Sequence, residues 1–202
     1  FERALELDPH NPENIWQRFF IRALVGDFPG AWQNYECRFD LQSRTTPDHG
    51  FTQPRWQGEP LPEQTILLHA EQGFGDTIQM IRYASKVAEQ IGKVILWAPE
   101  PLAKLMETVD GIDHIITQYS PSTQFDVHIP LMSLPGVFQD SLESIPTITP
   151  YLGPSSLCGK IHPIKKIGIS WAGSGNQPLD RRSVPFEQFQ PLIQDDSPLC
   201  FS

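Results

Sequence analysis

The segment from His69 to Tyr83, HAEQGFGDTIQMIRY, combines acids with two glycines where a short apolar run gives way to an amphipathic stretch. In α/β proteins such a strand-to-helix junction lies at the ligand-binding edge of the sheet. Gly73 and Gly75 let the backbone turn tightly and come close to a ligand. The helix that follows points free N–H groups to the same place, which favours anionic groups such as phosphates.

Two carboxylates of this segment are candidates for proton transfer. Asp76 lies between the glycine loop and the helix, where a carboxylate can take the proton from an attacking hydroxyl. The same residue begins the pattern Asp-Thr-Ile-Gln, which is that of a helix-capping box. Helix capping therefore explains the presence of Asp76 about as well as catalysis does. Glu71 is the rival base, because it lies at the end of the strand and faces either the crevice or the core, depending on the register.

A second glycine loop follows a second apolar run near the end of the chain. Residues 167–171 predict a buried strand, residues 172–176 a glycine-rich loop, and residues 185–193 a helix. Two arginines lie between loop and helix and would suit a diphosphate, because guanidinium groups bind phosphate bidentately. A solvated pair of surface arginines is the alternative. The predicted donor-phosphate residues are Gly173, Ser174, Arg181 and Arg182.

The histidines and cysteines suggest no metal site. His69, His114 and His128 have strand-like surroundings and are better explained as satisfied sheet residues than as catalysts. The three cysteines are an odd number at wide separations, without a CxxC pair, so they predict neither a zinc site nor a disulfide framework. A reducing compartment fits them better.

The elements around these residues alternate between strand and helix. Apolar runs predict strands at residues 65–68, 93–98, 112–117 and 125–129. The first helix is expected to begin near Thr77 and to stop at Gly92 in a left-handed conformation, and a short helix should follow Pro135-Gly136. This alternation predicts an α/β fold, a Rossmann-like parallel sheet with helices on both faces and right-handed crossovers.

The start of the chain has a different period. Phe1, Ala4 and Pro9 have the offsets of the last small, aromatic and proline positions of a tetratricopeptide repeat, and Tyr35 lies one period of ~34 residues after Phe1. An ordinary helical hairpin is the alternative. We therefore expect helices in residues 1–39, a linker in residues 40–63 pinned by Trp56, a Rossmann-like domain in 64–154 and the start of a second one in 164–202.

Composition limits the classes of partner. The chain has 202 residues, 39% of them hydrophobic, and a formal net charge of −9, which argues against nonspecific binding to nucleic acid or to an anionic membrane. No apolar run approaches the ~20 residues of a membrane helix, and no leader opens the chain, so a cytoplasmic location follows by default. The chain starts without Met inside a helix-like segment and stops after another, which predicts a fragment at both ends.

Several motifs together carry a family resemblance. They are Glu71-Gln72-Gly73-Phe74-Gly75-Asp76-Thr77-Ile78-Gln79 with Arg82-Tyr83, Pro130-Leu131-Met132-Ser133-Leu134-Pro135, Pro150-Tyr151-Leu152, and Trp171-Ala172-Gly173 ahead of Arg182-Ser183. With the N-terminal period, this combination resembles bacterial tetratricopeptide-repeat proteins with a glycosyltransferase-like domain. That domain is similar to the heptosyltransferase family, which has the GT-B fold of two facing Rossmann-like domains.

The resemblance implies an acceptor-side first domain and a second domain that binds a nucleotide sugar as substrate, with no further cofactor. By the resemblance, Asp76 is the general base of an inverting transfer, and Gln72, Gly73, Gly75 and Gln79 contact the substrate. Reaction in a cleft requires both walls to exclude water, so we expect no transfer by this fragment alone.

Two other classes stay open. One is a pure protein-interaction module, in which the tetratricopeptide-like helices recruit a partner and the α/β half is non-catalytic. A dinucleotide-dependent oxidoreductase also places Gly-x-Gly after a strand, but Gln79 stands near the place of the third glycine, and no clear ribose-binding acid follows the second strand.

Overall fold

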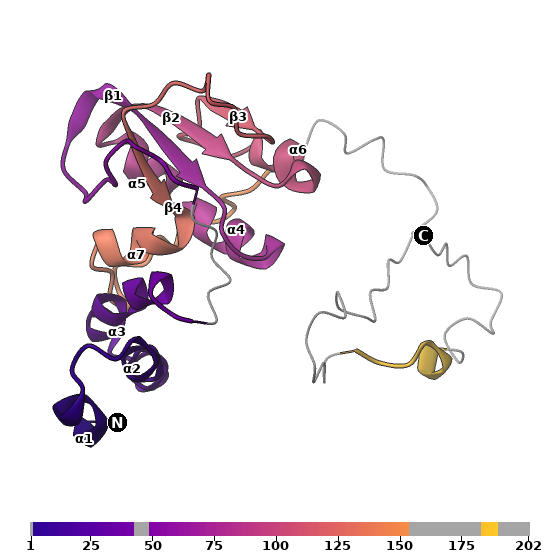
Figure 1. Cartoon of the computed structure of the whole chain (residues 1–202). Helices are drawn as coiled ribbons and strands as arrows, with labels where there is room; N and C mark the ends of the chain where they lie inside the picture. The colour runs from indigo at the N-terminus through magenta and orange to yellow at the C-terminus, as the bar shows by residue number, and fades with distance from the viewer. Residues whose placement is uncertain (1, 43–48, 154–182, 190–202) are drawn as a thin grey trace. The chain divides into compact units, whose positions relative to one another are not determined.

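A four-stranded, all-parallel sheet organises the chain and confirms the predicted α/β class (Figure 1). Its strands are β1 (Leu61–His69), β2 (Ile91–Trp97), β3 (His114–Ile116) and β4 (Val127–Pro130). They lie in the order β3-β2-β1-β4, so β1 and β2 are central. All four strands point the same way, and their carboxyl ends therefore share one edge of the sheet.

The computed structural model describes residues 2–42, 49–153 and 183–189. The chain divides into two units, Phe1–Ser155 and Ser156–Ser202, and the described part of the second holds the short 3-10 helix η5 (Phe186–Phe189). In the first unit the other helices are α1 (Glu2–Leu7), α2 (Pro12–Leu24), α3 (Phe28–Tyr35), η1 (Glu36–Phe39), α4 (Phe74–Met80), η2 (Ile81–Tyr83), α5 (Ala84–Ala88), η3 (Glu100–Leu102), α6 (Ala103–Met106), η4 (Leu131–Ser133) and α7 (Leu134–Val137).

One face of the sheet carries the main core. Alternate residues of the central strands, such as Ile66, Leu68 and Leu96, are fully buried there. They pack against residues from the helices that follow the strands, among them Val87 of α5 and Met106 of α6. Burial of branched apolar side chains on this scale is the main force holding the helices to the sheet.

The opposite face is covered differently from the prediction of helices on both faces. Leu67 and Ile95 pack there against Phe125, Phe51 and Tyr119, and none of these cluster members belongs to a helix among the described residues. The cause lies in the strand order. The path from β1 through β2 to β3 runs in one direction, so crossovers of one hand bring α4, α5 and α6 to a single face. The return from β3 to β4, on the far edge, is made by a loop without a helix.

The predicted role of Gly92 is wrong. It lies inside β2 and does not have the positive φ of a left-handed helix stop. A Cβ at this position would lie 2.2 Å from the carbonyl oxygen of Pro62, so close approach of the neighbouring backbone requires the glycine. The preceding Ile91, predicted on the helix, is also a strand residue and is 5% exposed. Helix α5 ends earlier, at Ala88.

The predicted linker wraps along the edge of the sheet. The Trp56 N–H donates to the His128 carbonyl (2.9 Å), and the His128 N–H donates to the Pro54 carbonyl (3.1 Å), which forms a parallel bridge beside β4. Trp56 itself is fully buried, and its indole N–H donates to the Glu59 carbonyl at 2.8 Å. The interpretation of this tryptophan as a pin is confirmed. Strand β1 also begins at Leu61, before the expected end of the linker.

Three α-helices and the 3-10 helix η1 precede the sheet. The Asn11 side chain caps α2 by accepting from the Asn14 N–H, and the Asp27 side chain caps α3 by accepting from the Gly30 N–H. An aromatic cluster joins α2 to α3, with ring centroids of Phe19 and Tyr35 4.8 Å apart. The helical character predicted for this region is present, while its assignment to the tetratricopeptide repeat stays a prediction.

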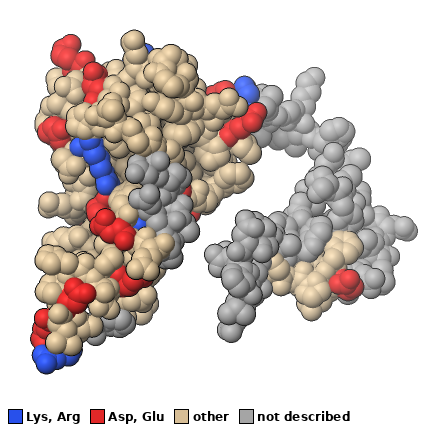
Figure 2. Space-filling model, viewed as in Figure 1, with Lys and Arg blue, Asp and Glu red and all other residues tan. Residues whose placement is uncertain are grey.

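The surface of the molecule is mostly uncharged on the face that Figure 2 shows, with acidic and basic side chains dispersed over it. Large apolar side chains are exposed on the first two helices and just after them: Leu7, Phe20, Ile21, Leu24 and Val25. None of the described helices has the length and apolar character required to cross a bilayer.

Candidate functional site

The glycine loop between β1 and α4 carries Asp76 at the carboxyl edge of the sheet. Helix α4 begins at Phe74, which makes Gly73 the N-cap and Asp76 the third helical residue, so the prediction of Asp76 as the first residue of the capping box is wrong. The Gly73 N–H donates to Oδ2 of Asp76 at 2.9 Å. Oδ1 of Asp76 accepts no hydrogen bond from any residue that the structure describes. One oxygen thus caps the helix, while the half-buried carboxylate keeps the other for an incoming donor.

The two glycines leave the loop open. Neither Gly73 nor Gly75 has a positive φ, so neither is required by backbone conformation. A Cβ on Gly75 would meet no atom within 4 Å, while one on Gly73 would lie 3.2 Å from Oδ2 of Asp76. The absence of side chains therefore gives a ligand room to approach the backbone here.

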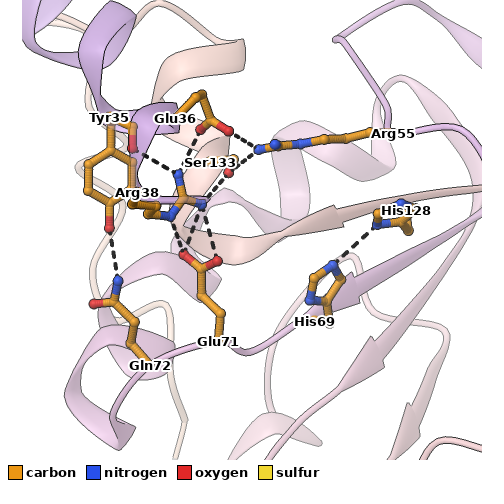
Figure 3. A network of polar contacts seen from close by, with 9 residues as sticks. All are labelled: Tyr35, Glu36, Arg38, Arg55, His69, Glu71, Gln72, His128 and Ser133. Carbon is orange, nitrogen blue, oxygen red and sulfur yellow. Dashed lines mark hydrogen bonds and ion pairs between the residues drawn. The ribbon is translucent and has the colours of Figure 1, made fainter. Parts of the chain in front are cut away.

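Glu71 faces the interior and pairs with an arginine from the helical region. Its side chain is 0% exposed, and that of Arg38 is 3% exposed. Nε and Nη2 of Arg38 donate to the two oxygens of Glu71 at 3.0 and 3.1 Å, a bidentate arrangement. Burial raises the pKa of Glu71, and the Arg38 charge opposes that rise. The pair joins η1 to the end of β1 (Figure 3).

The pair is extended by three more polar side chains. Arg38 also donates to Oγ of Ser133 at 2.7 Å and to Oε1 of Glu36 at 2.9 Å. Arg55 contacts both Ser133 and Glu36 from the other side (Figure 3). Burial acts to raise the pKa of Glu36, but the charges of Arg38 and Arg55 outweigh it and hold that pKa below its usual value. The Arg38 cluster, defined as Arg38, Glu71, Glu36, Arg55 and Ser133, is therefore balanced in charge.

Tyr35 and Gln72 form the border of this cluster. The Gln72 amide donates to the Tyr35 hydroxyl at 3.2 Å, and the guanidinium of Arg38 lies 4.2 Å from the centre of the Tyr35 ring. Burial raises the pKa of Tyr35 to about 12, so this phenol is neutral near pH 7. Gln72 is itself exposed, with one end of its side chain held in place by the tyrosine.

A histidine pair occupies the loop-covered face next to the same strand end. Nε2 of His69 lies 3.3 Å from Nδ1 of His128 (Figure 3), and the His49 ring is edge-on to His69 at 5.1 Å. Burial lowers the pKa of His69 to about 2, with His49 and His128 adding to the effect. Burial also lowers the pKa of His128. Both rings are therefore neutral sheet residues, but the prediction of satisfied histidines is wrong for His69, whose buried Nδ1 has no hydrogen-bond partner among the described residues. No group of metal-binding side chains occurs in the described part of the chain.

The structure brings together the site residues predicted at the first glycine loop. It leaves the predicted donor-phosphate residues untested. Residues 71–76 surround one junction, and the exposed Gln79 lies on α4 just beyond them, where its carbonyl accepts from Arg82 at 3.1 Å. The predicted donor-phosphate residues Gly173, Ser174, Arg181 and Arg182 lie outside the described residues.

Sequence reasoning missed Arg38, Glu36, Arg55 and Ser133 as members of a site. Arg38 and Glu71 are separated by 33 positions, and Arg38 and Ser133 by 95. No local spacing signals such a contact. The one available sign was an arginine shortly after an aromatic helix, in a region otherwise explained by its helical period.

The chain matches no protein-family model, no curated protein and no solved structure. The geometry by itself offers an exposed loop with an accessible carboxylate beside a buried, neutralised charge cluster. Such an arrangement can accept a proton at Asp76, while the Arg38 cluster ties the end of β1 to η1 and to Ser133.

Proposed function

We propose that the chain is the acceptor-side part of a glycosyltransferase-like protein of GT-B type, whose donor-side domain would begin near residue 164. The observation that carries the proposal is the position of Asp76, at the carboxyl edge of an all-parallel sheet with one oxygen accessible. Ligands of open parallel sheets bind at that edge. The resemblance of the loop and of the motifs after it supplies the substrate class, a nucleotide sugar and a hydroxyl acceptor.

In this proposal Asp76, and not Glu71, is the general base. A base must lie within hydrogen-bond reach of the hydroxyl that it deprotonates. The carboxylate of Glu71 is closed off from solvent, and Arg38 occupies both of its oxygens. Glu71 instead positions the loop, through Arg38 and Ser133. The substrate contacts expected of Gln72, Gly73, Gly75 and Gln79 are consistent with the open side of the loop and belong to the same proposal.

The test is Asp76→Asn in the full-length gene product. Asparagine retains an oxygen that can accept from the Gly73 N–H, so the melting temperature should change little. The transfer rate should fall by about 10²–10⁴-fold, because the base is lost. Retention of the rate, or an equal loss of rate and stability, would show that Asp76 is only a cap.

A matched control is Asp113→Asn. Oδ2 of Asp113 accepts the Val94 N–H at 2.7 Å, so the same isosteric change removes the charge from another aspartate with one backbone contact. Asp113 precedes β3 and therefore lies at the amino edge of the sheet, away from the proposed site. This variant should keep the parent transfer rate.

One observation favours the second candidate, an interaction module. Leu7, Leu24 and Val25 are 74%, 83% and 73% exposed on the helical region. Helical repeats bury such faces against neighbouring repeats, so the expected occupant is another helical repeat. A second copy of the chain would supply one, and sedimentation should then show self-association that Leu24→Asp abolishes. Leu142→Asp, at a leucine 66% exposed elsewhere, is the control, and a monomer at all concentrations would count against this candidate.

A further inference from the structure

A cavity of about 410 Å³ lies between α3, the segment around Arg55 and α7. Its lining contains none of the residues predicted as catalytic or substrate-binding. Three members of the Arg38 cluster form part of its wall: Glu36, Arg55 and Ser133. Figure 3 shows the contacts among these three side chains. The volume falls within the range of about 300–1,000 Å³ that small-molecule sites occupy. The cavity is thus a second candidate site, beyond the proposed function.

The polar groups of the cavity are uncharged or already neutralised. Gln33, Gln57 and Gln139 contribute primary amides, each able both to donate and to accept hydrogen bonds. Arg55 is held by Glu36, so an anionic ligand would have to displace a carboxylate from it. A cationic ligand would likewise compete with Arg55 for Glu36. This chemistry favours a neutral ligand that carries many donors and acceptors.

Apolar wall is supplied by Trp32, which is half-buried and lines the cavity. Its indole N–H donates to the carbonyl of Asp140 at 3.1 Å, while Trp56 lies fully buried behind the wall. Because this N–H group is occupied, the Trp32 ring is fixed and offers carbon surface. Fixed aromatic carbon beside convergent amides suits a ligand with both C–H faces and hydroxyl edges.

Gln139 has an unfavourable backbone conformation for its type. It is the one non-glycine residue with positive φ (51°) among the described residues. Its N–H donates to the Gly136 carbonyl (3.2 Å), and the next N–H, of Asp140, donates to the Pro135 carbonyl (3.0 Å). These two bonds define a Schellman motif at the end of α7, in which glycine is the favoured residue. The glutamine side chain is present despite this cost, and it lines the cavity.

We propose that this cavity binds a neutral, hydroxyl-rich small ligand of the carbohydrate class, held by the amides of Gln33, Gln57 and Gln139 against Trp32. The ligand's hydroxyl groups meet donors and acceptors of both kinds, and it leaves the Glu36–Arg55 pair intact.

The experiment is an NMR titration of the ¹⁵N-labelled 202-residue chain. Methyl β-D-glucoside, N-acetyl-D-glucosamine and cellobiose are the neutral probes. D-glucuronate, D-glucose 6-phosphate and D-glucosamine are the charged counterparts. At least one neutral probe should shift the indole signal of Trp32 and the side-chain amide signals of the three glutamines, with saturation. The charged counterparts should bind more weakly.

Gln139→Gly separates binding from folding. Removal of one neutral hydrogen bond should weaken binding by about three- to tenfold. Glycine suits the left-handed position, so the melting temperature should be equal or higher, by up to about 2–4 °C. Gln33→Ala on the exposed side of α3 should weaken binding by a similar factor. Gln124→Gly removes an exposed amide outside the lining and should leave the affinity unchanged.

Three results would overturn the inference. The first is the absence of saturable shifts with every neutral probe. The second is tighter binding of glucuronate, glucose 6-phosphate or glucosamine than of the neutral sugars. The third is an affinity that neither Gln139→Gly nor Gln33→Ala lowers. None of these results depends on Asp76 or on transfer activity, so they leave the proposed function to its own test.

Discussion

Two buried polar groups stand close together in the sequence at the end of β1, and the fold treats them in opposite ways. Glu71 is held by a bidentate arginine, with further contacts from the polar residues around that arginine. His69 lies among aromatic rings and contacts a second histidine across the sheet. Burial raises the pKa of Glu71 and lowers that of His69. The same desolvation therefore acts on an acid and on a base, with opposite signs.

The comparison shows two ways in which a sheet edge can hold polar side chains away from water. Glu71 has a partner of opposite charge, and the pair is tolerated because its hydrogen bonds are satisfied. His69 has no such partner, and it is tolerated because it stays neutral. The Arg38 cluster is therefore sensitive to the loss of a partner, whereas the histidine pair is sensitive to acid.

The largest effect is expected from Glu71→Ala. The change leaves the guanidinium of Arg38, only 3% exposed, without its main counterion. Loss of one partner from a buried pair costs about 3–5 kcal/mol, and urea unfolding should show a fall of this size in the free energy of unfolding.

Glu107→Ala is the control for this change. Lys104 and Glu107 form an ion pair at 3.2 Å, but their side chains are 63% and 52% exposed. Exposed pairs contribute about 0–1 kcal/mol, so the control should remain close to the parent. Equal losses in the two variants would remove the distinction between the Arg38 cluster and a surface pair.

An intermediate effect is expected from acid at His69. Its pKa in the folded chain is about 2 and its unfolded value is 6.5, so its contribution to stability is complete above pH 6.5 and is lost as the pH falls below it. His69 alone should lower the free energy of unfolding by about 2 kcal/mol between about pH 8 and about pH 5. Protonation of the ring is opposed by burial and by His49, His128, Arg55 and Arg38.

His69→Phe isolates this contribution, because phenylalanine fits the aromatic surroundings and does not titrate. The difference in unfolding free energy between parent and variant should move in favour of the variant as the pH falls from about 6.5 to about 5. Glu71, whose pKa is raised, acts in the opposite direction but is common to both proteins. His10→Gln, at an exposed histidine, is the control variant. Parallel parent and His69→Phe profiles would contradict the neutral-histidine interpretation.

The smallest effect is expected from Arg55→Met at the rim of the Arg38 cluster. The Arg55 side chain is 29% exposed, and Arg38 still contacts Glu36 when it is removed. The methionine stem retains contact with the neighbouring Phe39 ring, over which Arg55 lies at 4.9 Å. The loss should be about 0.5–1 kcal/mol and should shrink at high salt. If Arg55→Met lowered the free energy of unfolding as much as Glu71→Ala, the more exposed Arg55 would contribute as much to stability as the buried Arg38–Glu71 pair. The distinction between the buried and the exposed members of the Arg38 cluster would then be wrong.

Strands were predicted better than helix ends. Each of the four predicted apolar runs overlaps one of the four parallel strands. The sequence could predict them because an apolar run of strand length is a local property of the chain. The stop at Gly92 failed, since glycine serves both left-handed turns and close backbone contacts, and only the position of Pro62 decides between them. The helix expected near Thr77 begins earlier, at Phe74, because the backbone of Gly73 takes the capping place.

The candidate site was predicted in part for a similar reason. The glycines, Glu71 and Asp76 lie within one short segment, so the sequence was enough to bring them together. The choice between the two acids required the register of β1 and the approach of η1. Both are long-range outcomes of packing, and they bury Glu71 against Arg38 while Asp76 stays accessible.

The sequence alone determined the α/β class, the four strands and the loop that carries Asp76, because each depends on the period of apolar residues or on a few neighbouring residues. Only the tertiary structure decided that a loop covers the second face of the sheet and that Arg38 meets Glu71 and Ser133. It also decided that three glutamines converge on one cavity. These contacts join positions far apart in the chain, and the strand order and the packing of α3 and α7 select them, which no local pattern records.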